Sequence, residues 1–139
     1  MEPILGLDLG SKTCGIAISD SLGMLAHGIE TFRFPTGRDE KAVVRVQELA
    51  RKHHVHTIVL GLPKHMNGDI GVRGNISQAF KEKLEAALPG VTIVLEDERW
   101  TTKVAENQLI FADVSRKKRK QVIDKMAAVT ILQGYLDRT

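Results

Sequence analysis

The chain of 139 residues lacks the features of a secreted or membrane-embedded protein. Cys14 is its only cysteine, so no disulfide can form within the chain, which suits a reducing compartment. No apolar run approaches the roughly 20 residues of a membrane span, and Glu2 and Asp8 do not fit a secretory signal peptide. The sequence therefore predicts a cytoplasmic protein that has no membrane partner.

Aromatic residues are also scarce, and the net charge is small. The chain has one Trp, one Tyr and four Phe, and its net charge is only +3, from 20 Lys and Arg against 17 Asp and Glu. This balance excludes a histone-like polycation. Residues 116–120 (RKKRK) are nevertheless five consecutive cations, and the rest of the chain carries a net charge of −2. We therefore expect a near-neutral domain with one basic segment that can contact a polyanion.

The order of apolar runs and turn residues predicts an α/β fold. The expected strands 4–9 and 15–19 are joined by so short a turn that they must pair antiparallel, and a third strand is expected between residues 24 and 34. Beyond it we expect helices at 39–53, 72–88, 101–111 and 118–136, with strands at 57–60 and 91–95. Strands separated by helices favour parallel pairing. The prediction is one domain over residues 1–139, a mixed five-stranded sheet flanked by helices.

Asp8 is the first candidate for chemistry, because it lies inside an apolar strand. Side chains alternate along a strand, so Asp8 shares its face with Gly6 and Gly10. A carboxylate in a central strand is costly unless it is paired, hydrogen-bonded or bound to metal. Backbone N–H groups at the strand end could satisfy it, but the small flanking glycines leave space for another group to approach, and buried charges are rare without a partner, which favours a functional role.

Two further segments present carboxylates. Glu96, Asp97 and Glu98 follow the strand 91–95, at the end of the strand where ligands bind in α/β sheets; taken alone, they fit a solvated acidic strand end better than a binding site. Asp124 heads a helical stripe formed by Ala128, Ile131 and Tyr135, so it is expected on the face turned toward the sheet. Carboxylates from three segments suit Mg²⁺ or Mn²⁺, and two such ions can hold a phosphodiester and activate a water.

Four ordered blocks of sequence resemble the YqgF family, whose members are also called RuvX-type Holliday junction resolvases or pre-16S rRNA nucleases. The blocks are residues 6–12 (GLDLGSK) with 15–20 (GIAISD), 61–68 (GLPKHMNG), 97–102 (DERWTT) and 120–128 (KQVIDKMAA). Trp100 stands where an aliphatic residue is expected, a departure that concerns packing more than chemistry. Since the blocks span nearly the whole chain, the resemblance is specific.

The resemblance implies a ribonuclease H-like fold and a nuclease that depends on Mg²⁺ or Mn²⁺. Asp8 would be the metal ligand from the first strand, and Asp124 the acid from the last helix. The middle acid would come from the block that begins at Asp97; Glu98 is preferred and Asp97 is the second choice, while Glu96 lies outside the block.

Several cations are expected to contact the nucleic acid. Lys12 lies in the turn after Asp8, where backbone N–H groups and a cation can cradle a phosphate. The other candidates, from the glycine-rich segment 61–74, the acidic block and the basic run, are Lys64, His65, Arg73, Arg99, Arg116, Lys117 and Lys120. An exposed turn, a plain connector, an ion pair of Arg99 with Asp97 and a solvated helix start remain the simpler alternatives.

The predicted function is hydrolysis of phosphodiester bonds at the 5′ end of pre-16S rRNA during ribosome biogenesis, by a monomer or homodimer. The alternative within the same class is a Holliday junction resolvase that cuts four-way DNA in recombination or repair. A non-catalytic module that binds structured RNA is the alternative from another class. A kinase-like ATPase is disfavoured because 139 residues leave no room for a second lobe. His53, His54 and His56 are expected to close a helix rather than to bind zinc.

Overall fold

A computed structural model describes residues 2–62, 71–97 and 116–138 of the chain. The elements, in order, are β1 (Ile4–Leu9), β2 (Thr13–Ser19), β3 (Ala26–Arg33), α1 (Glu40–His53), β4 (Thr57–Leu62), α2 (Gly71–Ala87), β5 (Thr92–Asp97) and α4 (Arg116–Arg138). Within these ranges, no helix combines the length and the apolar character needed to cross a membrane.

The strands form one mixed five-stranded sheet in the order β3-β2-β1-β4-β5. β1 pairs antiparallel with β2, and β2 with β3, while β4 runs parallel to both β1 and β5. The predicted combination of an antiparallel hairpin with parallel strands is therefore confirmed. It places β1, with its carboxylate, at the centre of the sheet.

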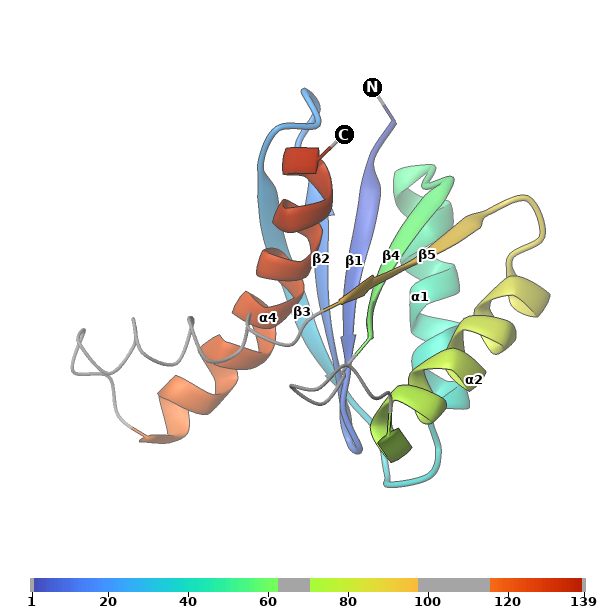
Figure 1. Cartoon of the computed structure of the whole chain (residues 1–139), viewed down its shortest axis with the longest axis vertical. Helices are drawn as coiled ribbons and strands as arrows, with labels where there is room; N and C mark the ends of the chain where they lie inside the picture. The colour runs from blue at the N-terminus through green and yellow to red at the C-terminus, as the bar shows by residue number, and fades with distance from the viewer. Residues whose placement is uncertain (1, 63–70, 98–115, 139) are drawn as a thin grey trace.

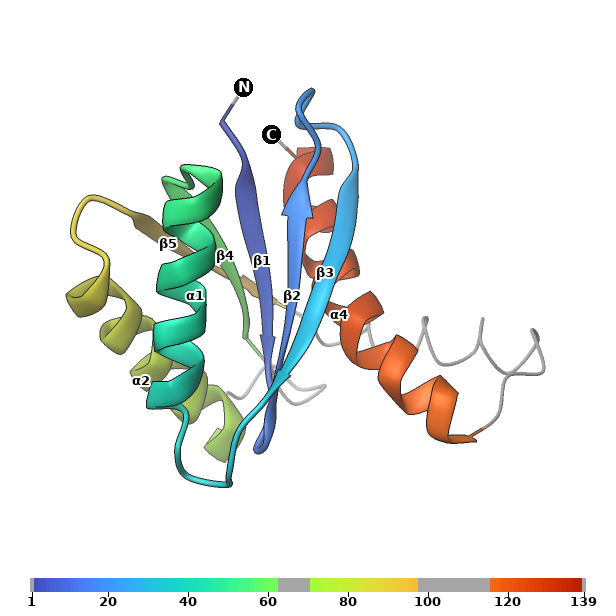
Figure 2. The ribbon, with the colours of Figure 1, turned by 180° about the vertical axis from the view of Figure 1, so that it is seen from behind.

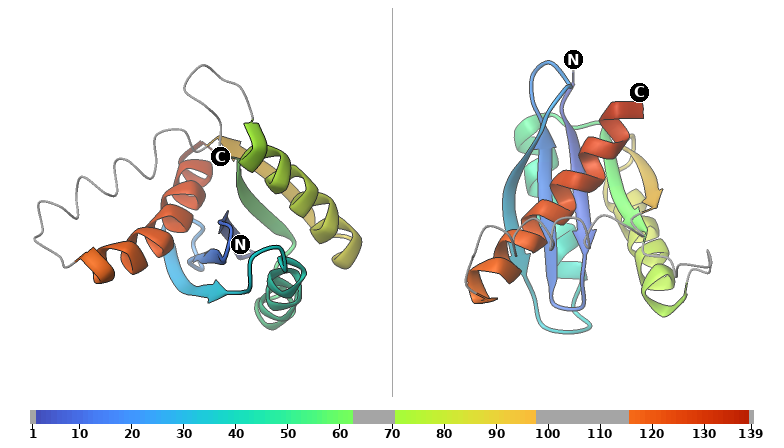
Figure 3. Two further views of the ribbon diagram at one scale, coloured as in Figure 1. Left: turned by 90° about the horizontal axis from the view of Figure 1, so that it is seen from below. Right: turned by 60° about the vertical axis from the view of Figure 1, so that its left-hand side comes forward.

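Helices cover both faces of the sheet. Helices α1 and α2 lie together on one face, and α4 crosses the strands diagonally on the other (Figures 1, 2 and 3). The α1/α2 face holds the larger core, which includes Leu5, Leu7, Ile58, Leu60 and Phe80. The α4 face holds a smaller core of Ala17, Val59, Ala128, Ile131, Leu132 and Leu136. Alternation along β1 thus sends its leucines to one face and Gly6 and Asp8 to the other.

Helix α4 approaches β1 closely because Gly6 has no side chain. A Cβ atom at Gly6 would lie 2.6 Å from the Cβ of Leu132 and 3.1 Å from the carbonyl oxygen of Ala128. The first of these distances is a steric overlap with an atom fixed to the helix backbone. Gly6 therefore sets how near α4 can come to the strand that carries Asp8.

A methyl group at Gly6 should destabilise the protein. We expect Gly6→Ala to lower the free energy of unfolding by about 1–3 kcal/mol, because α4 must shift outward to relieve the overlap. Gly134→Ala in α4 is the matched control: its Cβ would lie an ordinary 3.9 Å from Glu96 Oε1, and alanine favours a helix by about 1 kcal/mol. Urea unfolding of both variants measures this, and equal effects of the same sign would contradict the close approach.

The element boundaries differ from the predicted ones in ways that matter for the acids. β4 and β5 each run two residues further than expected, so Glu96 and Asp97 lie inside β5 instead of following it. α4 begins at Arg116, two residues early, and the whole basic run therefore lies in its first turns. The helix expected at 101–111 lies outside the described residues.

One expected core position of α2 is wrong. The spacing of Ile76, Phe80, Leu84 and Leu88 in the sequence predicts one buried stripe, but Ile76 is 48% exposed, and Ser77 is buried instead. Steps of four residues drift by about 40° each around a helix with 3.6 residues per turn. The face centred on Phe80 and Leu84 therefore reaches Ser77 and leaves Ile76 in solvent.

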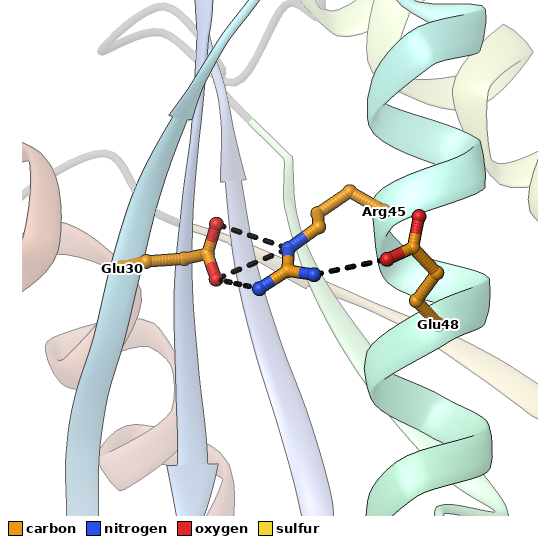
Figure 4. Close-up of polar contacts among 3 residues, drawn as sticks. All are labelled: Glu30, Arg45 and Glu48. Carbon is orange, nitrogen blue, oxygen red and sulfur yellow. Dashed lines mark hydrogen bonds and ion pairs between the residues drawn. The ribbon is translucent and has the colours of Figure 1, made fainter.

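An ion-pair cluster ties α1 to the edge strand β3. Arg45 of α1 contacts the Glu30 carboxylate at 2.5 Å through Nη2 and at 3.1 Å through Nε, and contacts Glu48 at 3.0 Å (Figure 4). Two nitrogens of one guanidinium on one carboxylate give a strongly directional contact. The cluster holds β3 against α1, on the face of the sheet opposite the one that α4 covers.

Candidate active site

Asp8 lies in a row of residues that runs across the sheet. Asp8 pairs with Gly15 of β2, and Gly15 pairs with Thr31 of β3. Directly paired residues point to the same face of a sheet, so Thr31 and Asp8 share a face with only a glycine between them. Gly15 is buried and contributes no side chain between them.

The same pattern continues on the other side of Asp8. Leu7 pairs with Leu60, so Gly61 is the next residue of β4 beside Asp8, and Gly61 pairs with Glu96 of β5. We call the five residues Thr31, Gly15, Asp8, Gly61 and Glu96 the Asp8 row. Its half-buried central carboxylate is flanked by glycine on both sides and by polar side chains at both ends.

Glu96 is the buried acid of the Asp8 row. Glu96 is 6% exposed, and its carboxylate forms an ion pair and hydrogen bond with Arg138 near the end of α4. The contact raises the pKa of the Arg138 guanidinium through its hydrogen bond to Glu96. The buried charge is thus compensated, and the pair fastens the last turn of α4 to β5. Glu96 lies outside the block of residues that resembles the family, yet it shares the face of Asp8.

Asp97 occupies a different position. It pairs with Leu62 at the end of β5, is exposed, and by alternation lies on the face of Leu95, which packs against the α1/α2 core. Glu98, the preferred middle ligand, lies outside the described residues. The geometry of β5 therefore separates Asp97 from the face that carries Asp8.

Asp124 is placed on α4 by the backbone alone. Ala128, whose carbonyl lies over Gly6, is one helical turn after Asp124, about 6 Å along the axis. α4 runs opposite to β1 (Figure 1), and Asp8 lies two residues, about 6.6 Å, beyond Gly6. Asp8 and Asp124 therefore lie in the same direction from the contact between Gly6 and Ala128, at similar distances along β1 and α4. The expected stripe is also found, since Ala128 and Ile131 are buried and Tyr135 is half-buried.

The candidate cations take several positions. Lys12 is exposed in the tight β1–β2 turn, which Gly10 N closes by donating to the carbonyl oxygen of Thr13 at 2.7 Å. Arg116, Lys117 and Lys120 lie in the first turns of α4, and Arg73 lies in the first turn of α2. Lys64, His65 and Arg99 lie outside the described residues. The β1–β2 turn and the carboxyl ends of β4 and β5 meet at one edge of the sheet.

Sequence reasoning missed two residues on the face of Asp8. Thr31 belongs to the Asp8 row, and Arg33, which pairs with Thr13, is an exposed cation two residues nearer the Lys12 turn. No pattern in the sequence marks them, because an irregularity in β3 changes the alternation there. Only the strand register shows which face they occupy.

Cys14 and the histidines have structural roles. Cys14 is fully buried, and burial, with the charges of Asp8 and Glu30 as smaller contributions, raises the pKa of its thiol well above the usual range. Cys14 is thus a packing residue of the α1/α2 core. His54 ends α1 in a left-handed conformation with φ 56°, and His56 lies 3.0 Å from Glu2. Among the described residues, no three His, Cys, Asp or Glu side chains are grouped to hold a metal.

Comparison with known proteins agrees with this geometry. The family model RuvX, described as Holliday junction resolvase, matches residues 2–138. The chain belongs to the RuvX family. A relative from Staphylococcus aureus (strain JH9), named "Putative pre-16S rRNA nuclease", is 56% identical over 134 residues, which cover 96% of this chain and 94% of that protein.

Solved structures show the fold of this RuvX-family protein. The fowlpox virus Holliday junction resolvase matches with a TM-score of 0.62 at 14% identity, covering 99% of both chains. The T. thermophilus RuvC in complex with a Holliday junction substrate matches with a TM-score of 0.59 at 13% identity, covering 99% of this chain and 96% of that one. The predicted family and the ribonuclease H-like fold are confirmed.

Proposed function

We propose that this RuvX-family protein is a nuclease that cuts the 5′ region of precursor 16S rRNA during ribosome biogenesis in the cytoplasm. The observation that carries the proposal is the Asp8 row: a half-buried carboxylate at the centre of the sheet, flanked by glycines on both neighbouring strands. The 56% identity to a protein named for this activity supports the choice of substrate.

The residues of the site fit a hard divalent cation. All the candidate ligands are carboxylates, the donors that Mg²⁺ and Mn²⁺ prefer. Asp8, Glu98 and Asp124 would hold the ions. When bound, such ions activate a water and stabilise the leaving oxygen of a phosphodiester.

Glu98 is a better candidate for the middle ligand than Asp97. Glu96 lies on the face of Asp8 and Asp97 on the opposite face. The position of Asp97 on the opposite face disfavours it as a partner of Asp8, which leaves Glu98 as the remaining candidate from the acidic block. Glu96 itself is engaged by Arg138, which leaves its carboxylate to anchor α4 rather than to bind an ion.

Cations on two sides of the Asp8 row would hold the substrate. Lys12 in the β1–β2 turn and Arg33 on β3 lie at one end of the face, and the first turns of α4 bring Arg116, Lys117 and Lys120. We expect Lys64, His65, Arg73 and Arg99 to add phosphate contacts. Such contacts position a nucleic acid without reading its sequence.

A four-way DNA junction is the second candidate substrate, because the matching family is described as Holliday junction resolvase. A resolvase must cut two strands in a coordinated way, which a symmetric homodimer achieves. Sedimentation of the purified protein separates the two cases: a monomer favours the RNA substrate, and a homodimer is compatible with both.

Parallel cleavage assays test the proposed function. We expect the purified protein to cut precursor 16S rRNA with Mg²⁺ or Mn²⁺, to stop when the metal is chelated, and to act more slowly on a four-way DNA junction. Faster cutting of the junction would indicate that the four-way DNA junction is the substrate. Tight, salt-sensitive binding of RNA with no metal-dependent product would overturn the nuclease assignment and leave a binding module.

A further inference from the structure

The further inference concerns a pocket at the C-terminal ends of α1 and α2, which lie side by side on one face of the sheet (Figure 2). We call it the α1/α2 pocket. Its volume is about 590 Å³, within the range of pockets that bind small molecules. Val55 and Leu88 contribute apolar side chains to its wall. Arg51, His54 and His56 contribute a guanidinium and two imidazoles, so the pocket combines apolar surface with groups that can hydrogen-bond an anion.

The α1/α2 pocket lies away from the Asp8 row. Val55 and Leu88 belong to the core on the α1/α2 face, whereas Asp8 lies on the face that α4 covers. His56 precedes β4 and lies five residues before Gly61 of the Asp8 row, about 16 Å along the strand direction. A ligand in this pocket would therefore be separate from a phosphodiester bound at Asp8.

The backbone carbonyl groups beside the pocket are already hydrogen-bonded within the protein. They accept from N–H groups in four contacts: Val55 N to Ala50 O at 2.9 Å, His54 N to Arg51 O at 3.4 Å, Gln47 Nε2 to Ala87 O at 3.0 Å and Val91 N to Leu88 O at 3.1 Å. Helix C-termini carry a partial negative charge on such carbonyls, and these hydrogen bonds reduce it. The side-chain donors of the pocket are therefore open to an anion from outside.

Three side chains can supply those donors. Arg51 and His54 are exposed, and within the described ranges neither forms an ion pair with a carboxylate. His56 contacts the exposed Glu2 through Nδ1 at 3.0 Å, which leaves its Nε2 for a ligand. A phosphate monoester carries nearly two negative charges and three acceptor oxygens at neutral pH, so it matches three such donors.

The rest of the pocket favours an organic molecule over a bare phosphate. Val55 and Leu88 are buried apolar residues, which offer a phosphate nothing to bind. Imidazole and guanidinium groups stack on flat rings such as nucleobases. A flat ring that carries a phosphate would therefore use both the apolar wall and the planar side chains.

The backbone of His54 supports a role for its side chain. His54 follows the last residue of α1 with φ 56°, and in the described part of the chain it is the one residue other than glycine with a positive φ. Glycine is preferred at this position because a Cβ atom is strained there. The protein thus carries an imidazole at the pocket where glycine would be more stable, and such strained residues cluster at binding sites.

We propose that the α1/α2 pocket binds a free phosphate monoester carried by a flat ring, which is the chemistry of a nucleoside monophosphate. Arg51, His54 and His56 hold the phosphate, and the ring packs against the apolar wall. The site goes beyond the proposed function, because it uses no residue of the Asp8 row and none of the cations assigned to the RNA.

Calorimetry with adenosine monophosphate (AMP), adenosine and inorganic phosphate tests the pocket in a buffer that contains EDTA. We expect AMP to bind more tightly than either of its parts. Arg51→Gln should weaken AMP binding by roughly 10- to 100-fold, the loss expected for hydrogen bonds between charged groups. Lys52→Gln is the matched control, because Lys52 is an exposed neighbour of the same charge that does not line the pocket. It should leave AMP affinity near the wild-type value.

His54→Gly gives a readout that a merely structural role would not move. Glycine relieves the left-handed backbone, so the ligand-free variant should unfold at a higher urea concentration than the wild type. We expect the same variant to bind AMP more weakly, because it lacks the imidazole. Higher stability with unchanged AMP affinity would show that His54 only ends α1, and would contradict the proposal.

Asp8→Asn and the RNA substrate distinguish this pocket from the nuclease site. AMP should bind Asp8→Asn as tightly as the wild type, and precursor rRNA should not displace it. Weaker binding to Asp8→Asn, or displacement by RNA, would place AMP on the RNA-binding surface and overturn the proposal. Equal affinity for AMP and inorganic phosphate, or no binding of AMP, would overturn it as well. Since none of these results depends on RNA cleavage, the two proposals can fail separately.

Discussion

Asp8→Asn should abolish cleavage while the protein stays folded. Asparagine has nearly the shape of aspartate but lacks the negative charge that a divalent ion requires, so the rate should fall by at least about a thousandfold. Because the two side chains have nearly the same shape, the half-buried position of Asp8 should accept the amide without a steric overlap. Metal-dependent cleavage of precursor rRNA and the urea midpoint should be measured on the same preparation.

Asp20→Asn is the matched control for that substitution. Asp20 follows β2 at the other end of the sheet, and its Oδ1 accepts a hydrogen bond from Met24 N at 2.9 Å in the turn before β3. That hydrogen bond holds the pKa of the Asp20 carboxyl below its usual value. Asparagine can accept the same bond, so cleavage should remain near the wild-type rate. Retained cleavage in Asp8→Asn would show that Asp8 is not a ligand.

Neutralising Arg116, Lys117 and Lys120 with glutamine should weaken RNA binding and flatten its salt dependence. Each phosphate contact contributes about 0.7 to the slope of log K against log salt for single strands and about 0.9 for duplex DNA. If all three cations contact phosphates, the slope should become shallower by about 2 to 2.7. Binding isotherms at several salt concentrations measure it, and Mn²⁺ affinity should stay largely unchanged.

Replacement of Lys41, Arg51 and Lys52 with glutamine removes the same charge elsewhere. All three are exposed on α1, which lies on the face of the sheet opposite α4. This control changes the net charge equally but should leave the salt slope near its wild-type value. Equal effects of the two triple variants would indicate that only net charge, and no local contact through α4, governs binding.

The sheet could be predicted from the sequence because its signals are local. The short turn after Leu9 requires an antiparallel hairpin, and the helices that separate the later strands favour parallel pairing. Asp8 was identified because a charge within an apolar strand needs a partner. Asp124 was placed on α4 by helical period, which the buried Ala128 and Ile131 support.

The rest of the site depends on register, which the sequence does not encode locally. Glu96 received little weight because its motif begins one residue later, yet the extension of β5 places it on the face of Asp8. Thr31 and Arg33 could not be assigned to this face, because a single extra residue in β3 reverses the alternation beyond it. Both errors come from interactions between strands rather than within one.

A crystal of the protein grown with Mn²⁺ and a short RNA gives the most direct test of the metal site. Anomalous scattering locates manganese independently of the protein model. We expect a manganese ion bound to the Asp8 carboxylate within about 2.5 Å, on the sheet face covered by α4. Manganese bound elsewhere in the protein, with none at Asp8, would contradict the Asp8 row as the catalytic metal centre.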